Sequence, residues 1–171
     1  MIFHISIPTR NPENVAKVIA ELWGGAAFPF FPHRNESWVA FAGDDRNSAV
    51  ECYPQDALIA PSEEEFPTGF QVLRSPPAEA DQDQPPRRSA VHAAVATPLT
   101  QAEVVALGER EGWLTRFAQR GMFNVVELWI ENAIMFEVLP AEQQAEYLNS
   151  QTLDSWHKAV AAFAARQAET G

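Results

Sequence analysis

Two histidines and two glutamates stand at matching places in the two halves of this chain. His4 and His92 lie in short strand-like segments, and Glu51 and Glu137 follow them at similar separations in later strand-like segments. Imidazole nitrogen and carboxylate oxygen suit a divalent ion such as Zn²⁺, Ni²⁺, Co²⁺ or Mn²⁺. If the four side chains converge, they form a site for one such ion, and a six-coordinate ion would keep positions open for water or a bidentate substrate.

The alternation of residue types predicts the face on which each of the four side chains lies. Successive side chains of a strand point to opposite faces of a sheet. His4, Glu51, His92 and Glu137 each have apolar neighbours on both sides, and those neighbours suit packing under a helix. We therefore expect one imidazole and one carboxylate from each half on the face turned away from the helices.

The elements that must position these residues occur twice, in the same order. In the first half, the strand 3–7 precedes a helix that begins at Asn11-Pro12 and ends at Gly24-Gly25. Val15, Val18, Ile19 and Leu22 give this helix one apolar face. Three further strands are expected at 28–31, 37–42 and 48–53.

The second half repeats this order. The strand 91–95 precedes a helix that opens with a capping box, Thr100-Gln101-Ala102-Glu103, and ends at Gly112. Strands follow at 114–118, 124–130 and 133–139, and the last two form a hairpin about Glu131-Asn132. An ancient duplication explains both the repeated order and the matched residues.

The sequence predicts an α+β fold of two βαβββ modules in one chain, with facing, mostly antiparallel curved sheets and a C-terminal helix. The modules are expected at 1–60 and 90–140, joined by a Pro-rich connector, 61–89, in which 70–73 forms a short extra strand. The C-terminal region, 141–171, is expected to be helical to about residue 168. Trp156, Val160 and Phe163 would pack this helix on the body or on a second subunit.

Composition narrows the class of partner. The formal net charge is −11, and the one basic doublet, Arg87-Arg88, lies in the connector, so no positive stripe is expected to bind nucleic acid. No apolar run is long enough to cross a membrane. The single cysteine, Cys52, excludes an internal disulfide framework and fits a cytoplasmic protein. We expect a small-molecule ligand or substrate, with the terminal helix and the outer sheet edges as surfaces for a homodimer.

The positions of His4, Glu51, His92 and Glu137 resemble the ligand positions of the vicinal oxygen chelate superfamily, which includes glyoxalase I, bleomycin-resistance proteins and extradiol dioxygenases. The combination His, Glu, His, Glu looks most like the bacterial glyoxalase I pattern, over about residues 2–54 and 90–140. The resemblance implies that the opening strand lies beside the closing strand in each module. His4 would then be next to Glu51, and His92 next to Glu137.

The resemblance also implies a function. We expect a metal-dependent lyase or isomerase that moves a proton beside a carbonyl, with Glu51 or Glu137 as the base. A binding protein of the bleomycin-resistance type, without a metal, and an extradiol-type dioxygenase are the alternatives. Bacterial glyoxalase I has an arginine for glutathione four residues after its first ligand. Pro8 stands there in this chain, which counts against glutathione.

Other residues have less specific interpretations. Glu127 is a rival to Glu137, because a change of one residue in the hairpin would shift the face assignments of its strands. We expect His33 and His157 to be structural or exposed, and Cys52 to lie in the core. Trp38 and Tyr53 could line an apolar pocket, although aromatic residues at strand spacing more often serve packing.

Overall fold

The computed structural model describes residues 3–30, 36–60, 71–74 and 92–152, together with 154, 155, 157, 158, 160–162 and 165. The first module contains β1 (His4–Thr9), α1 (Pro12–Trp23), β2 (Ala26–Pro29), β3 (Trp38–Phe41) and β4 (Ala49–Pro54). A two-stranded ribbon follows, made of β5 (Ala57–Ala60) and β6 (Gln71–Arg74). The second module contains β7 (His92–Ala96), α2 (Gln101–Glu111), β8 (Thr115–Gln119), β9 (Asn124–Ile130) and β10 (Ile134–Leu139), and α3 (Ala141–Ser150) comes after it.

Each module forms one four-stranded sheet, and the two sheets have the same topology. The strand orders are β1-β4-β3-β2 and β7-β10-β9-β8. In each sheet the opening strand pairs in parallel with the closing strand, and the other pairs are antiparallel. The prediction of an α+β fold with two βαβββ modules and a C-terminal helix is confirmed.

The pairing registers also agree between the modules. Ser6 is the partner of Glu51 in the first sheet, and Ala94 is the partner of Glu137 in the second. His4 lies two residues before Ser6, and His92 lies two residues before Ala94. Both histidines therefore have the same position relative to the glutamate of their own module. The repeated sequence order therefore corresponds to a repeated three-dimensional arrangement.

Local sequence signals explain where the helices of the modules begin and end. The Asn11 side chain accepts a hydrogen bond from the Asn14 amide at the start of α1, and Thr100 and Glu103 form the expected capping box on α2. Both helices end at a glycine in the left-handed conformation, Gly24 (φ 68°) and Gly112 (φ 69°). These signals were readable because they depend only on neighbouring residues.

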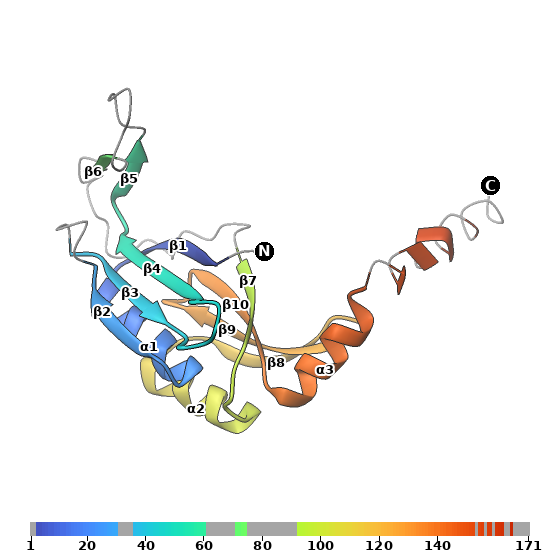
Figure 1. Cartoon of the computed structure of the whole chain (residues 1–171). Helices are drawn as coiled ribbons and strands as arrows, with labels where there is room; N and C mark the ends of the chain where they lie inside the picture. The colour runs from blue at the N-terminus through green and yellow to red at the C-terminus, as the bar shows by residue number, and fades with distance from the viewer. Residues whose placement is uncertain are drawn as a thin grey trace.

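The two modules share one hydrophobic core. α1 packs on its own sheet, chiefly on β2, β3 and β4, while α2 packs on β8 and β9, and the two helices touch each other. In Figure 1 both helices lie at the lower left, α1 beside β2 and β3 and α2 below β8. Buried side chains from both modules meet there, among them Ile19 and Leu22 from the first and Leu107, Leu128 and Phe136 from the second. The opposite face of each sheet, called here the inner face, is the one that carries His4, Glu51, His92 and Glu137.

Polar contacts also join the modules. Arg110 of α2 forms two hydrogen bonds with Glu21 of α1, of 2.9 and 2.8 Å. The Glu131 carboxylate accepts hydrogen bonds from the amides of Arg10 and Asn11, at 2.6 and 2.8 Å. The Thr97 hydroxyl donates to the Leu22 carbonyl. The contacts of Glu131 and Thr97 satisfy backbone groups at the junction of β1 and α1 and at the end of α1.

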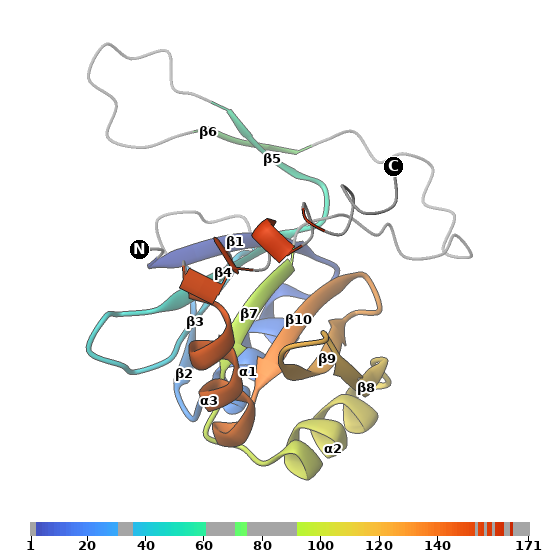
Figure 2. The ribbon, with the colours of Figure 1, turned by 90° about the vertical axis from the view of Figure 1, so that its right-hand side faces the viewer.

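The connector and the C-terminal region are only partly described. The predicted extra strand at 70–73 corresponds to β6, and the β5–β6 ribbon projects from the body in both views (Figures 1 and 2). Most of the connector 61–89, including Arg87-Arg88, lies outside the described residues, as do Trp156 and Phe163. Val160 is described and is 62% exposed.

The predicted strands lie within two residues of their expected bounds, and two differences have a local cause. The second strand was expected at 28–31 but is Ala26–Pro29, because its pairing with β3 begins with Ala26 opposite Phe41. The C-terminal helix was expected to run to about residue 168, but α3 ends at Ser150. Thr152 then caps a new helical stretch by accepting a hydrogen bond from the Ser155 amide at 3.1 Å. The polar run Asn149 to Thr152 favours such a cap over a continuous helix.

Among the described residues, no helix combines the length and the apolar character that a membrane crossing requires.

Candidate functional site

In the first module, His4 and Glu51 lie side by side on the inner face. His4 Nε2 is 3.9 Å from Glu51 Oε1, and the His4 side chain is 58% exposed while that of Glu51 is 14% exposed. The contact follows from the parallel pairing of β1 with β4, which brings residues far apart in the sequence onto adjacent strands. An exposed imidazole therefore stands beside a largely covered carboxylate.

Two hydroxyl groups fix the other oxygen of Glu51. Oε2 accepts hydrogen bonds from Ser6 Oγ at 2.7 Å and from the Tyr53 hydroxyl at 3.4 Å. Burial, the negative charge of Glu51 and the hydrogen bond to it raise the pKa of Tyr53 well above its usual value. Tyr53 thus stays protonated at neutral pH and acts as a donor. Glu51 is anchored through Oε2, and Oε1 is the atom turned toward His4.

In the second module, the corresponding glutamate has a different environment. His92 is exposed on β7 opposite Met135 of β10, and Glu137 lies opposite Ala94. Glu137 Oε1 accepts a hydrogen bond from Arg120 Nε at 2.7 Å, and its side chain is only 10% exposed. The Glu137 carboxylate is therefore bound by the guanidinium group of Arg120.

Arg120 belongs to a network that we call the arginine–glutamate cluster, made of Arg116, Arg120, Glu127 and Glu137. Arg120 Nη2 donates to Glu127 Oε1 at 2.6 Å, and Arg116 Nε donates to Glu127 Oε2 at 2.7 Å. The indole nitrogen of Trp129 donates to the same carboxylate at 3.1 Å. Glu127 and Glu137 are directly opposite each other on β9 and β10, so both are on the inner face and neither replaces the other.

The cluster keeps Glu127 ionised although it is buried. Burial alone would raise the pKa of this carboxyl, but hydrogen bonds from Arg120, Arg116 and Trp129 lower it to about 2. The side chain is 5% exposed. A carboxylate with so little exposure to water is stable in its ionised form only beside cations, and Arg116 and Arg120 are those cations.

The sequence interpretation did not identify the cluster. The sequence did contain a signal for part of it. The chain reverses between β8 and β9 near Gly121 (φ 81°), and the resulting register puts Arg116 opposite Glu127. Strand alternation then places Arg120 on the same face as Arg116. Which carboxylate Arg120 would bind depends on the loop geometry, which the sequence pattern does not give.

The predicted metal site can be tested against these side chains. In the first module, His4 and Glu51 have suitable donor atoms at a separation that two ligands of one ion can have. In the second, Arg120 holds Glu137. Among the described residues, no three His, Cys, Asp or Glu side chains are grouped so that they could hold a metal ion. The structure therefore brings His4 and Glu51 together, while Glu137 lies beside Arg120 on the second sheet.

The remaining residues named from the sequence fall mostly on packing or surface positions. Cys52 is fully buried in the core, and burial raises the pKa of its thiol, with a smaller effect from the charge of Glu131. Trp38 packs against the core on the helix side, under Lys17, and does not line the inner face. His157 is exposed. His33 lies outside the described residues.

Two exposed aromatic side chains lie on the same face of the first sheet as Glu51. Crossing the first sheet from Glu51, the strand partners are Val39 and then Phe28, and Phe41 stands two residues from Val39 on β3. Phe28 and Phe41 are 50% and 37% exposed, and their ring centroids are 6.3 Å apart. The first module thus offers an apolar surface beside its polar group.

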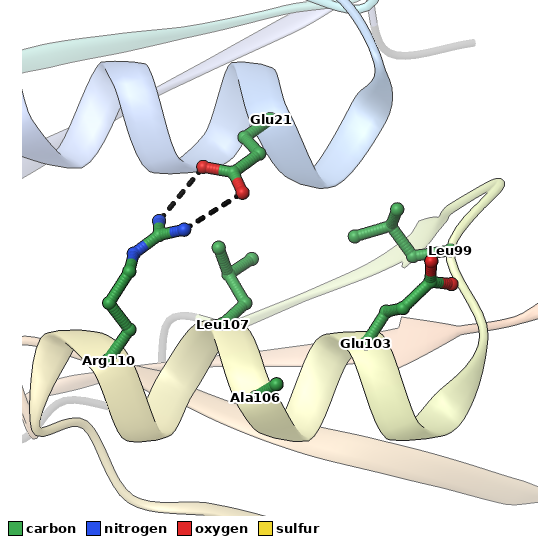
Figure 3. A pocket seen from close by; sticks show the side chains of 6 residues that line it. All are labelled: Glu21, Leu99, Glu103, Ala106, Leu107 and Arg110. Carbon is green, nitrogen blue, oxygen red and sulfur yellow. Dashed lines mark hydrogen bonds and ion pairs between the residues drawn. The ribbon is translucent and has the colours of Figure 1, made fainter.

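A shallow hollow of about 350 Å³ lies elsewhere, between the two helices. Its lining residues are Glu21, Leu99, Glu103, Ala106, Leu107 and Arg110 (Figure 3). The ion pair of Arg110 with Glu21 crosses it, and hydrogen bonds from Arg110 lower the pKa of Glu21. The hollow contains none of the four predicted ligands and belongs to the contact between the modules.

Comparison with known proteins gives no relative: no family model, no curated protein and no solved structure matches this chain.

Proposed function

We propose that this chain is a glyoxalase-like lyase or isomerase that moves a proton beside a carbonyl of a small substrate, with Glu51 as the base. The observation that supports this proposal most is the environment of Glu51. One carboxylate oxygen is anchored by Ser6 and Tyr53, and the other is turned toward the exposed His4. Glu137 is a weaker choice for the base, because Arg120 binds it.

The geometry suggests a role for each group. Glu51 Oε1 would take a proton from the carbon next to the substrate carbonyl, and the electron pair left behind would move onto the carbonyl oxygen. An imidazole N–H of His4 would donate a hydrogen bond to that developing oxyanion. Glu51 would then return the proton to the former carbonyl carbon, while the hydroxyl proton of the adjacent carbon passes to the former carbonyl oxygen, so that the carbonyl and the hydroxyl group exchange places. Ser6 and Tyr53 are positioning residues, because they act on substrate only through Glu51.

The substrate would have a polar end and an apolar part. The carbonyl belongs beside His4 and Glu51, and the exposed rings of Phe28 and Phe41 are on the same face of the same sheet. Aromatic rings gain from covering apolar surface. Small hydroxyketones and keto acids with an aromatic or aliphatic substituent are therefore suitable probes.

Deuterium exchange tests the proposed proton transfer without knowledge of the product. The protein is incubated with such probes in D₂O, and loss of the proton beside the carbonyl is followed by NMR. We expect Glu51→Gln to slow the exchange by about 10²-fold or more, because the base is removed. Glu109→Gln, an exposed glutamate on α2, is the matched control and should exchange like the unaltered protein. Equal rates for Glu51→Gln and the control would refute the role of Glu51.

A second proposal is a non-catalytic binding protein of the bleomycin-resistance type. It is favoured by the ion pair of Glu137 with Arg120, which leaves the second module without an available carboxylate. Such a protein would show ligand-dependent increases in melting temperature with the same probes, but no deuterium exchange. If no probe gives deuterium exchange or a thermal shift, the result would count against both proposals.

The metal-dependent form of the enzyme proposal has a separate test. Elemental analysis of the purified protein, compared with His4→Ala and His92→Ala, reports whether a divalent ion is bound and by which histidines. A stoichiometric ion lost in both variants would support the four-ligand site expected from the sequence. Retention of the ion in His92→Ala would exclude His92 as a ligand.

A further inference from the structure

We infer that Arg120 is an internal cation that takes the place of a metal ion in the second module and excludes divalent ions from Glu127 and Glu137. This inference concerns the second module alone and does not depend on the proton transfer proposed for Glu51. It rests on the two hydrogen bonds by which one guanidinium group bridges two carboxylates, to Glu137 at 2.7 Å and to Glu127 at 2.6 Å.

The position of the two carboxylates makes a cation necessary. Glu127 and Glu137 are direct partners on adjacent antiparallel strands, where opposite side chains lie about 5 Å apart and like charges repel. Their side chains are only 5% and 10% exposed, so water screens the repulsion poorly. Either a bound metal ion or a basic side chain could neutralise them. In this chain, Arg120 is seated between them.

Comparison with the first module shows which residues distinguish the arginine–glutamate cluster from the equivalent position around Glu51. The row of strand partners through Glu51 reads Ser6, Glu51, Val39 and Phe28. The equivalent row in the second module reads Ala94, Glu137, Glu127 and Arg116. Valine in the first row corresponds to Glu127 in the second, so only the second module has paired carboxylates. Among the described residues, an arginine binds Glu137, whereas the partners of Glu51 are Ser6, Tyr53 and His4.

Other side chains that can bind metal ions lie on the same face of the sheet as Arg120. Arg120 Nη2 is 3.8 Å from Met135 Sδ, and Met135 is the strand partner of His92. Glu127, Glu137, Met135 and His92 therefore share the inner face of the second sheet. Without Arg120, two carboxylates and an imidazole would remain on one face, a donor set that suits Zn²⁺ or Mn²⁺.

The experiment measures metal binding by the full chain. To remove binding at the first module, every variant carries His4→Ala, and Zn²⁺ binding is followed by equilibrium dialysis with elemental analysis. Arg120→Gln should gain about one equivalent of Zn²⁺, bound at least about tenfold more tightly than by the His4→Ala parent. Arg120→Lys keeps a positive charge and should gain much less. Adding Glu137→Gln to Arg120→Gln should abolish the gain.

Two results would overturn the inference. One is a folded Arg120→Gln variant, checked by circular dichroism, that binds no more Zn²⁺ than its parent. The other needs no change at Arg120: if Glu137→Gln alone lowers the Zn²⁺ bound by the His4→Ala parent, then Glu137 is already a ligand beside Arg120. That second comparison keeps the inference testable if Arg120→Gln does not fold.

Discussion

At the scale of single residues, the two modules use equivalent glutamates in different ways. Glu51 is held by neutral hydroxyl groups and stands beside an exposed histidine. Glu137 is held by a guanidinium and is paired with a second buried carboxylate, Glu127. A carboxylate bound to a cation is a poor base and a poor metal ligand, while one bound to hydroxyls keeps its negative charge available. The two modules thus place a glutamate at equivalent positions with different surroundings.

The depressed pKa of Glu127 predicts an acid-sensitive contribution to stability. The folded-state pKa is about 2, below the ordinary value of 4.5, so the stabilisation is complete above about pH 4.5. It is lost as the pH falls toward 2, because the unfolded chain takes up the proton first. We expect Glu127→Gln to cost about 1–3 kcal/mol at pH 7 and much less near pH 2.5, measured by urea unfolding. A pH-independent difference between the two proteins would contradict this assignment.

Sequence reasoning found the repeated residues but not the contacts of the second module. His4, Glu51, His92 and Glu137 were recognised because strand alternation and duplication are local or repeated patterns. Arg116 and Arg120 stand in β8 and the turn after it, and their partners are on β9 and β10. Such pairings are set by the register across several strands and by side-chain reach, which no local pattern encodes.

At the scale of the elements, capping residues and glycines account for both ends of α1 and of α2. The capping box at Thr100 and Glu103, the left-handed glycines and the hairpin turn were all readable from the sequence. Glu131 (φ 49°) and Asn132 (φ 57°) adopt the left-handed conformation that tight hairpins need. The end of α3 at Ser150 was missed because apolar spacing beyond it suggested one continuous helix.

Gly108 allows α2 to approach its sheet closely. A Cβ atom at this position would lie 1.8 Å from Thr115 Oγ1 and 3.1 Å from Leu128 Cδ1, so β8 or α2 would have to shift. We expect Gly108→Ala to destabilise the protein by about 1–3 kcal/mol, although alanine is the better helix former. The measurement is the free energy of unfolding in urea. Gln101→Ala, at an exposed position in the same helix, is the control and should change it by less than about 0.5 kcal/mol.

At the scale of the whole molecule, the modules are joined by a shared core and by a few buried or directional polar contacts. The helices of both modules contribute to one hydrophobic cluster, so neither sheet is covered independently of the other. The hairpin turn of the second module reaches the start of α1 in the first, where Glu131 accepts two backbone N–H groups. This arrangement fixes the relative positions of the two inner faces, and hence of the His4–Glu51 pair and the arginine–glutamate cluster.

Replacing Glu131 with asparagine tests the contact between the modules separately from the conformation of the hairpin turn. Asparagine tolerates the left-handed backbone at this position better than glutamate does, so the turn itself should be stabilised slightly. Its shorter side chain cannot reach the amides of Arg10 and Asn11, and an amide is a weaker acceptor than a carboxylate. The net result expected is a loss of about 1 kcal/mol or more in the free energy of unfolding, measured in urea. Glu142→Asn, at an exposed glutamate in the first turn of α3, provides the comparison. If Glu131→Asn is as stable as the unaltered protein, the polar contact of Glu131 with the amides of Arg10 and Asn11 contributes nothing measurable to the joining of the modules.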